Sequence, residues 1–129
     1  MFVTQLDECQ EYEFDTPYTR RARVIFDQEN LPDAAVSMIE IVMREGEYGP
    51  VHVHENAVEV YYCTGGRGTT TVNGEEVVLT KGTILYVHPG EKHQTFNAGP
   101  EDFRIVCFFA PAVSWAITRR QRKIEPIRD

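Results

Sequence analysis

Residues 46–66 read GEYGPVHVHENAVEVYYCTGG and combine three metal-ligand side chains with the alternation typical of β-strands. Side chains two residues apart in a strand point to the same face, so His52 and His54 share a face. Glu59 follows the break at residues 55–56, on a second run rich in Val and Tyr. Pairing of the two runs would bring three ligands to one point, and His93, in a downstream strand of its own, can complete the site.

Strand alternation also predicts which side chains surround these ligands. Tyr61 and Cys63 share the phase of Glu59, and Thr95 shares the phase of His93, so all three are candidates to support the ligands. Tyr61 is either a hydrogen-bonding partner of a ligand or substrate, or an ordinary packed aromatic. Cys63 is either a redox-sensitive thiol near a metal or, in the favoured interpretation, a small buried filler. The sequence names no catalytic residue.

Short strands separated by turns occupy most of the remaining chain. We expect strands at residues 20–26, 35–43, 57–63, 69–72, 75–79, 83–87 and 103–109, and one that carries His93. Asn73-Gly74 between two of them predicts a type I′ hairpin, which requires positive φ at both residues. This pattern predicts an all-β sandwich or barrel. We expect one domain over residues 1–129, with an N-terminal arm at 1–19, a barrel at about 20–110 and a tail at 111–129, where residues 112–123 can form a short helix.

Composition narrows the class of protein. The chain has 129 residues and a net charge of −7, which suits one domain and argues against a nucleic-acid binder. Its three cysteines are widely spaced, as expected of reduced thiols. The N-terminus lacks the features of a signal peptide, and the longest apolar run, residues 105–117, is shorter than the ~20 residues of a membrane span. We therefore expect a cytoplasmic protein without membrane contact.

Two spaced motifs resemble the signature motifs of the cupin superfamily, which are small jelly-roll β-barrels. They read Gly46-x5-His52-x-His54-x4-Glu59-x6-Gly66 and Gly82-x6-Pro89-Gly90-x2-His93-x3-Asn97. The resemblance covers roughly residues 36–110 and departs from the family at His88, where a proline is usual. It implies a cupin (jelly-roll) β-barrel in which the metal ligands are His52, His54, Glu59 and His93.

The resemblance also carries expectations about function. Three imidazoles and a carboxylate suit one divalent transition metal, Fe, Mn, Ni, Zn, Co or Cu, and ligand type does not choose among them. We expect a small-molecule enzyme with either Fe(II) dioxygenase chemistry or Lewis-acid isomerase, decarboxylase or lyase chemistry. The alternatives are a non-enzymatic binding module, a purely structural metal, or histidines that merely fill a polar barrel interior. Similar small cupins also imply a homodimer, formed through the outer strands and the N-terminal arm.

Overall fold

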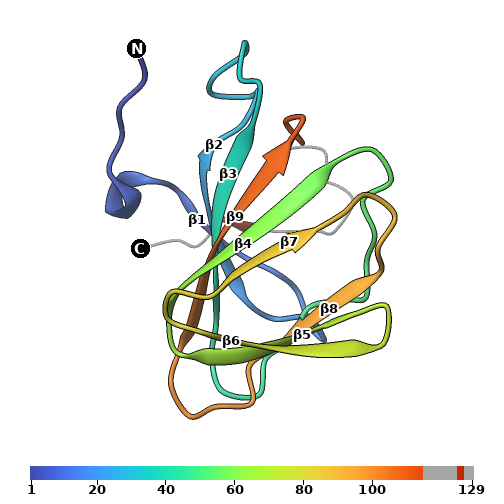
Figure 1. Ribbon diagram of the computed structural model, residues 1–129. Helices are drawn as coiled ribbons and strands as arrows, with labels where there is room; N and C mark the ends of the chain where they lie inside the picture. The colour runs from blue at the N-terminus through green and yellow to red at the C-terminus, as the bar shows by residue number, and fades with distance from the viewer. Residues whose placement is uncertain (115–124, 127–129) are drawn as a thin grey trace.

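The computed structural model describes residues 1–114 and 125–126, which form two antiparallel sheets that face each other (Figure 1). A 3-10 turn, η1 (Leu6–Glu8), precedes the first strand. The strands are β1 (Glu11–Glu13), β2 (Arg21–Phe26), β3 (Ser37–Met43), β4 (Val58–Gly65), β5 (Arg67–Val72), β6 (Glu75–Thr80), β7 (Ile84–Val87), β8 (His93–Phe96), β9 (Phe103–Ala110) and β10 (Glu125–Pro126). The expected all-β fold is confirmed, and the strands expected on either side of the His52–His54 run are present within two or three residues of their expected bounds. The run that carries His52 and His54 is not a strand and forms only an isolated bridge.

The larger sheet has the order β10-β1-β2-β3-β9-β4-β7, and the smaller sheet has the order β6-β5-β8. Strand β9 therefore lies between β3 and β4, although it follows both of them by some 40 residues or more in the chain. This long-range pairing closes the fold, because it joins the last long strand to the first half of the molecule. It also places β9 directly beside β4, the strand that carries Glu59.

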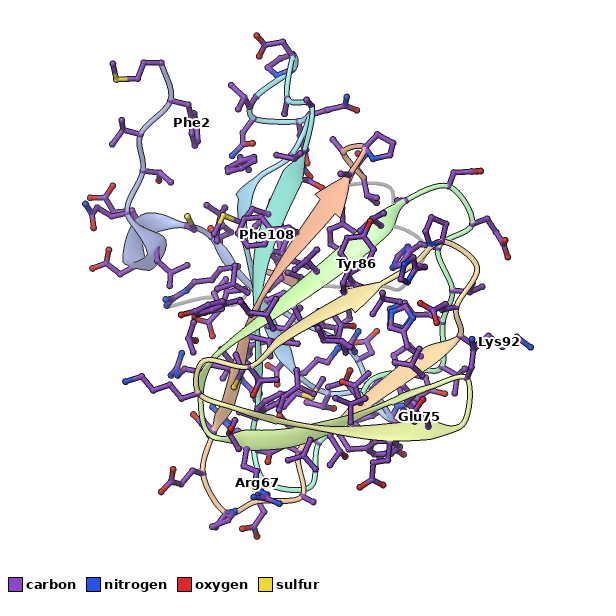
Figure 2. All side chains as sticks on the ribbon, in the orientation of Figure 1. Phe2, Arg67, Glu75, Tyr86, Lys92 and Phe108 are labelled. Atoms are coloured by element: carbon purple, nitrogen blue, oxygen red, sulfur yellow. The ribbon has the colours of Figure 1, made fainter. Side chains whose placement is uncertain are left out.

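Side chains from both sheets fill the space between them (Figure 2). Strand β9 shows the pattern most clearly, because Phe103, Ile105 and Cys107 are at most 2% exposed while the intervening residues face outward. Gly68 faces the Phe103 ring, and a Cβ atom at this glycine would lie 2.5 Å from the ring. The smaller sheet can pack this closely on β9 because residue 68 has no side chain.

The hairpin between β5 and β6 has the geometry that the sequence predicts. Asn73 and Gly74 both have positive φ, 48° and 85°, and Val72 pairs with Glu75 across the turn. The type I′ prediction is therefore confirmed. The turn sets the register of the two strands, since a two-residue loop allows only one pairing of its flanking residues.

One expectation from the sequence is wrong, and another lies outside the described residues. Pairing of the His52 run with the Glu59 run is wrong: His52 forms an isolated bridge with His93, at the start of β8, while Glu59 lies in the larger sheet. The helix expected at residues 112–123 lies almost entirely outside the described residues. Within the described residues, no helix has the length and apolar character needed to span a membrane.

Candidate metal centre

Three segments from different parts of the chain bring four potential metal ligands together. Glu59 points inward from β4, and His93 points inward from the first position of β8. Two backbone hydrogen bonds of 3.0 Å, one in each direction, tie His52 to His93, and His54 follows two residues later. One ligand atom from each of the four residues lies within 4.8 Å of the others. The site is thus assembled by the facing of the two sheets.

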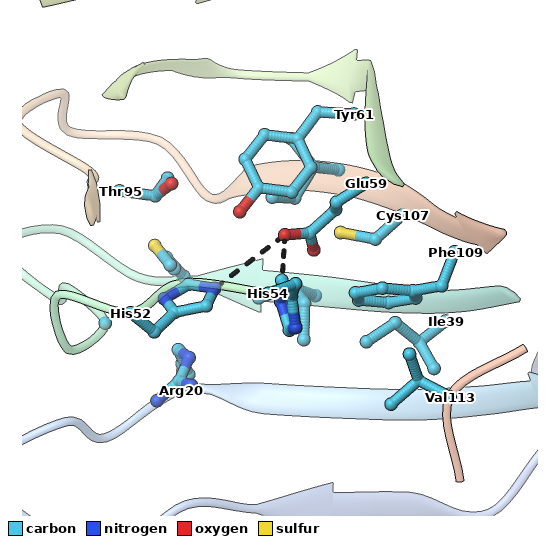
Figure 3. Close-up of a pocket in the computed structure, with 14 residues that line it drawn as sticks. Arg20, Ile39, His52, His54, Glu59, Tyr61, Thr95, Cys107, Phe109 and Val113 are labelled. Carbon is cyan, nitrogen blue, oxygen red and sulfur yellow. Dashed lines mark ion pairs between the residues drawn. The ribbon is translucent and has the colours of Figure 1, made fainter. Parts of the chain in front are cut away.

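A single carboxylate oxygen lies at the centre of the group. Oε1 of Glu59 is 2.9 Å from Nε2 of His93, 3.4 Å from Nε2 of His54 and 3.7 Å from Nε2 of His52. Figure 3 shows the side chains of His52 and His54 directed at this carboxylate. All three imidazoles therefore present the same ring nitrogen to the same point.

The other ring nitrogen of two histidines is held by the backbone. Nδ1 of His52 lies 3.0 Å from the carbonyl oxygen of Pro50, and Nδ1 of His93 lies 3.0 Å from that of Glu91. A carbonyl only accepts, so Nδ1–H donates in both cases, and the lone pair needed for a metal is left to Nε2 once that atom is deprotonated. Nε2 of His54 is buried without a hydrogen-bond partner among the described residues. This arrangement fits a metal ion, which would ligate Nε2 of all three rings.

The electrostatics of the group favour an ionised carboxylate. Burial alone would raise the pKa of Glu59, but its contacts with the three imidazoles outweigh burial and hold that pKa well below its usual range. Burial lowers the pKa of His52. Burial also acts to lower the pKa of His93, yet the hydrogen bond and charge of Glu59 more than offset it, and that pKa is raised. A negative oxygen surrounded by imidazole nitrogens is suited to a divalent cation.

Neutral donors lie next to the carboxylate. Burial, and then the charge of Glu59, raise the pKa of Tyr61 and of Cys107 well above their usual values, so both remain protonated at neutral pH. Thr95, which lines the same cavity as Tyr61, has its Oγ1 2.9 Å from Oγ1 of Thr70 on the smaller sheet.

A cavity of about 50 Å³ adjoins the four ligands, which is room for a small ligand or a few water molecules. Arg20 lines it and is 5% exposed. The guanidinium stacks on the ring of Phe14, with Cζ 3.6 Å from the ring centroid, and its Nη1 donates to the carbonyl of Tyr18 at 2.7 Å. The remaining wall is largely apolar and includes Ile39, Ile41, Met43, Ile105, Phe109 and Val113. A buried cation in an apolar wall suits a small anionic ligand.

Only two of the three residues that the sequence suggests as supports for the ligands lie at the cavity. Tyr61 and Thr95 line the cavity, whereas Cys63, although fully buried, does not, and its thiol faces the carbonyl of Gly65 at 3.5 Å. The interpretation of Cys63 as a buried filler is therefore the one that fits. The thiol beside the carboxylate is Cys107, which the sequence analysis missed although strand alternation over residues 103–109 already pointed it inward. Arg20 was missed as well, and no local pattern marks it.

Comparison with known families identifies the fold class. Residues 39–109 match the family described as the cupin domain. They make up more than half of the chain and include all four candidate ligand residues. The chain belongs to the cupin family. Its two facing sheets are the jelly-roll barrel of that family, and the four candidate ligand residues line its interior.

Relatives of known sequence are similar over only part of the chain. An uncharacterised protein of Methanocaldococcus jannaschii is 31% identical over 78 residues, which are 60% of this chain and 62% of the relative. An oxalate-binding protein of Thermotoga maritima is 32% identical over 56 residues, 43% of this chain and 46% of the relative. The chain thus matches about half the length of the curated relatives.

Solved structures extend the likeness of the fold to almost the whole chain. A predicted oxalate decarboxylase from Thermotoga maritima superposes with a TM-score of 0.77 at 20% identity and covers 85% of this cupin and 99% of that protein. Ectoine synthase from P. lautus superposes with a TM-score of 0.75 at 24% identity, over 99% of this cupin and 91% of the synthase. At these identities the likeness is one of fold.

Proposed function

We propose that this cupin is a metal-dependent enzyme that acts on a small carboxylate-containing molecule. One divalent transition metal would be held by His52, His54, Glu59 and His93. The observation that carries the proposal is the convergence of three Nε2 atoms on Oε1 of Glu59, with the backbone holding Nδ1 of two of the rings. Such preorganisation is what a ligand set requires, because each ring already has the orientation that coordination demands.

The bound metal would supply either dioxygen chemistry, if it is Fe(II), or Lewis-acid polarisation of a carbonyl or carboxylate, if it is Mn, Ni or Zn. The chain's own residues supply the rest. Tyr61 remains a neutral phenol and can donate a hydrogen bond to a ligand in the cavity. The apolar wall restricts water around the ligand, which strengthens each electrostatic contact within the site.

Cavity size and charge support the choice of substrate class. The guanidinium of Arg20 is fixed by Phe14 and Tyr18 and offers a positive charge opposite an acidic ligand. The cavity of about 50 Å³ admits only a few non-hydrogen atoms beside the metal. A relative named as oxalate-binding and a neighbour named as a predicted oxalate decarboxylase agree with a short mono- or dicarboxylate.

A non-enzymatic carboxylate-binding protein is the second candidate. The observation that favours it is that Tyr61 and Cys107, the titratable groups beside Glu59 apart from the three candidate ligand histidines, both have raised pKa values and so provide no base at neutral pH. The two candidates differ in turnover and agree in ligand binding. A binding assay alone therefore does not separate them.

The test begins with metal analysis of protein purified anaerobically and without a metal-chelating tag. We expect one transition-metal ion per chain, and a melting temperature that falls on chelation, because binding to the native state stabilises it by RT ln(1 + [L]/Kd). The loaded protein is then titrated with oxalate and similar short carboxylates, and turnover is followed by mass spectrometry under air and under argon. Arg20→Lys should weaken carboxylate binding while metal content is retained, and the exposed His88→Ala serves as the control.

The outcomes are distinct. Substoichiometric metal, together with a melting temperature that chelation leaves unchanged, would overturn the metal centre and the enzyme with it. Carboxylate binding without turnover would select the second candidate. Turnover only under air would indicate oxygen chemistry, and equal turnover under argon would indicate Lewis-acid chemistry.

A further inference from the structure

Gly49 lacks a side chain at a place where the fold does not demand a glycine. Its φ is not positive, unlike that of Gly46, so the backbone here has a conformation that other residues adopt. A Cβ atom on Gly49 would meet its nearest neighbours at 3.5–3.8 Å, which is ordinary van der Waals contact. Gly68 is different, because its Cβ would lie 2.5 Å from the Phe103 ring. Neither backbone conformation nor packing therefore explains the glycine at position 49.

The three atoms nearest to this Cβ position all belong to the guanidinium of Arg20. The Cβ would lie 3.5 Å from Nε, 3.6 Å from Cζ and 3.8 Å from Nη2. An atom in the plane of the group, beyond its Nε–Nη2 edge, would be clearly farther from Cζ than from either nitrogen. The nearly equal distances therefore place the Cβ over one face of the guanidinium. Phe14 covers the other face, because its ring centroid is also 3.6 Å from Cζ and two groups cannot both be so close on one side.

Hydrogen bonds to neighbouring segments fix the backbone of Gly49 in this place. Its N–H donates to the carbonyl of Thr95 at 3.0 Å, and its carbonyl accepts from Nε2 of Gln94 at 3.0 Å. Two residues earlier, the carbonyl of Glu47 accepts from the N–H of Asn97 at 2.9 Å. The segment is thus tied to β8 and to the turn that follows it. The backbone cannot move away from the guanidinium to make room for a side chain without breaking these bonds.

Gly49 and Arg20 both line the cavity beside the candidate metal ligands, and Figure 3 shows Arg20 close to His52 there. Nη1 of Arg20 already donates to the carbonyl of Tyr18 at 2.7 Å. The Cβ position at residue 49 lies over the other half of the guanidinium, which carries Nε and Nη2. Because the cavity measures only about 50 Å³, even one methyl group at this position would narrow it beside the positive charge.

We propose that Gly49 determines the specificity of the cavity: because it lacks a side chain, a carboxylate group of the ligand has room beside the guanidinium of Arg20. A larger residue would cover Nε and Nη2 and keep the carboxylate at a distance, which weakens a contact that depends on close approach. The inference rests on the proposed function, in which Arg20 meets the acidic ligand. Gly49 has no part in holding the metal ion, so its substitution separates carboxylate affinity from metal affinity.

A double-mutant cycle between positions 49 and 20 tests the inference. Zinc-loaded protein is titrated in a calorimeter with oxalate, malonate and acetate as probes. Gly49→Ala should bind one Zn²⁺ ion as the unaltered protein does, yet bind the carboxylates roughly 10-fold or more weakly, the usual effect of one methylene in a closed pocket. In the Arg20→Lys background the same alanine should cost less than about twofold, because the guanidinium that it covers is gone.

Gly65→Ala is the matched control. Gly65 also lacks a positive φ, and its Cβ would lie 3.8 Å from Cδ of another arginine, Arg104, at the end of β4 and outside the cavity. This variant should bind the carboxylates as the unaltered protein does. Circular dichroism melting and metal analysis of each variant check that the fold and the metal site persist.

The outcomes separate this inference from the proposed function. If the unaltered zinc-loaded protein binds none of the three carboxylates, the proposed substrate class fails and the inference fails with it. If the unaltered protein binds them and Gly49→Ala binds them equally well, or loses affinity equally in both backgrounds, only the inference is overturned. Unfolding of Gly49→Ala, or loss of its metal, would overturn it as well, because packing would then be the reason for the glycine.

Discussion

Replacement of Glu59 by Gln is the sharpest test of the candidate metal centre. The side chain keeps its size and loses its charge, so the packing around this 4% exposed residue is preserved. In the proposed metal-loaded site the carboxylate would be the only anionic ligand among the described residues, and removal of one partner from a buried charge pair costs about 3–5 kcal/mol. At about 1.4 kcal/mol per tenfold, metal affinity should fall roughly 100- to 4,000-fold.

Competition against a chromophoric chelator, with Zn²⁺ and Co²⁺ at pH 7.5, measures this loss. Glu91→Gln is the matched control, because Glu91 lies two residues before His93 but its carboxylate contacts the exposed His88 instead of the ligand group. It should bind metal with the affinity of the unaltered protein. A folded Glu59→Gln variant that binds one metal ion within tenfold of the original affinity would show that the carboxylate is not a ligand.

Three further predictions concern protons, thiols and packing. The pKa of His93 is raised because its contact with Glu59 outweighs its burial, so at low pH a metal must displace a proton from this ring. Calorimetric titrations from pH 8 to 5.5 should therefore show metal affinity falling as the pH drops through that pKa. Ellman's reagent should react with one thiol per native chain, that of Cys9, and with three after unfolding, because the other two cysteines are at most 1% exposed; two or more fast thiols in the native chain would contradict the burial. Gly68→Ala should lower the free energy of unfolding by about 1–3 kcal/mol in urea titrations, because its Cβ would lie 2.5 Å from the Phe103 ring; an unchanged midpoint would contradict this close approach.

Strand alternation and turn chemistry are local properties, and the sequence was sufficient for both. The Asn73-Gly74 hairpin follows from two residues that tolerate positive φ, and the inward phase of Glu59 and Tyr61 follows from a period of two. These two features depend on neighbours within a few residues, so they can be read without knowing which strands pair. The jelly-roll barrel was predicted differently, from the resemblance of the two motifs to those of the cupin superfamily.

The position of a side chain along the length of the barrel does not follow from strand alternation. Cys63 has the same phase as Glu59 but lies four residues farther along β4, roughly 13 Å at about 3.3 Å per residue, and so misses the site. Cys107 reaches the carboxylate because β9 inserts beside β4 and pairs Cys107 with Tyr61. Alternation gives the direction of a side chain, and only strand pairing gives its position along the barrel.

The sequence by itself therefore determined the family, the strands and the four residues with metal-ligand chemistry. Tertiary structure alone decided that His52 is bridged to His93, that Nε2 is the nitrogen presented to Glu59, and that Arg20 lines the cavity. The physical reason is that ring orientation and cavity lining depend on backbone groups contributed by distant segments. Such long-range pairing leaves no period in the sequence from which it can be read.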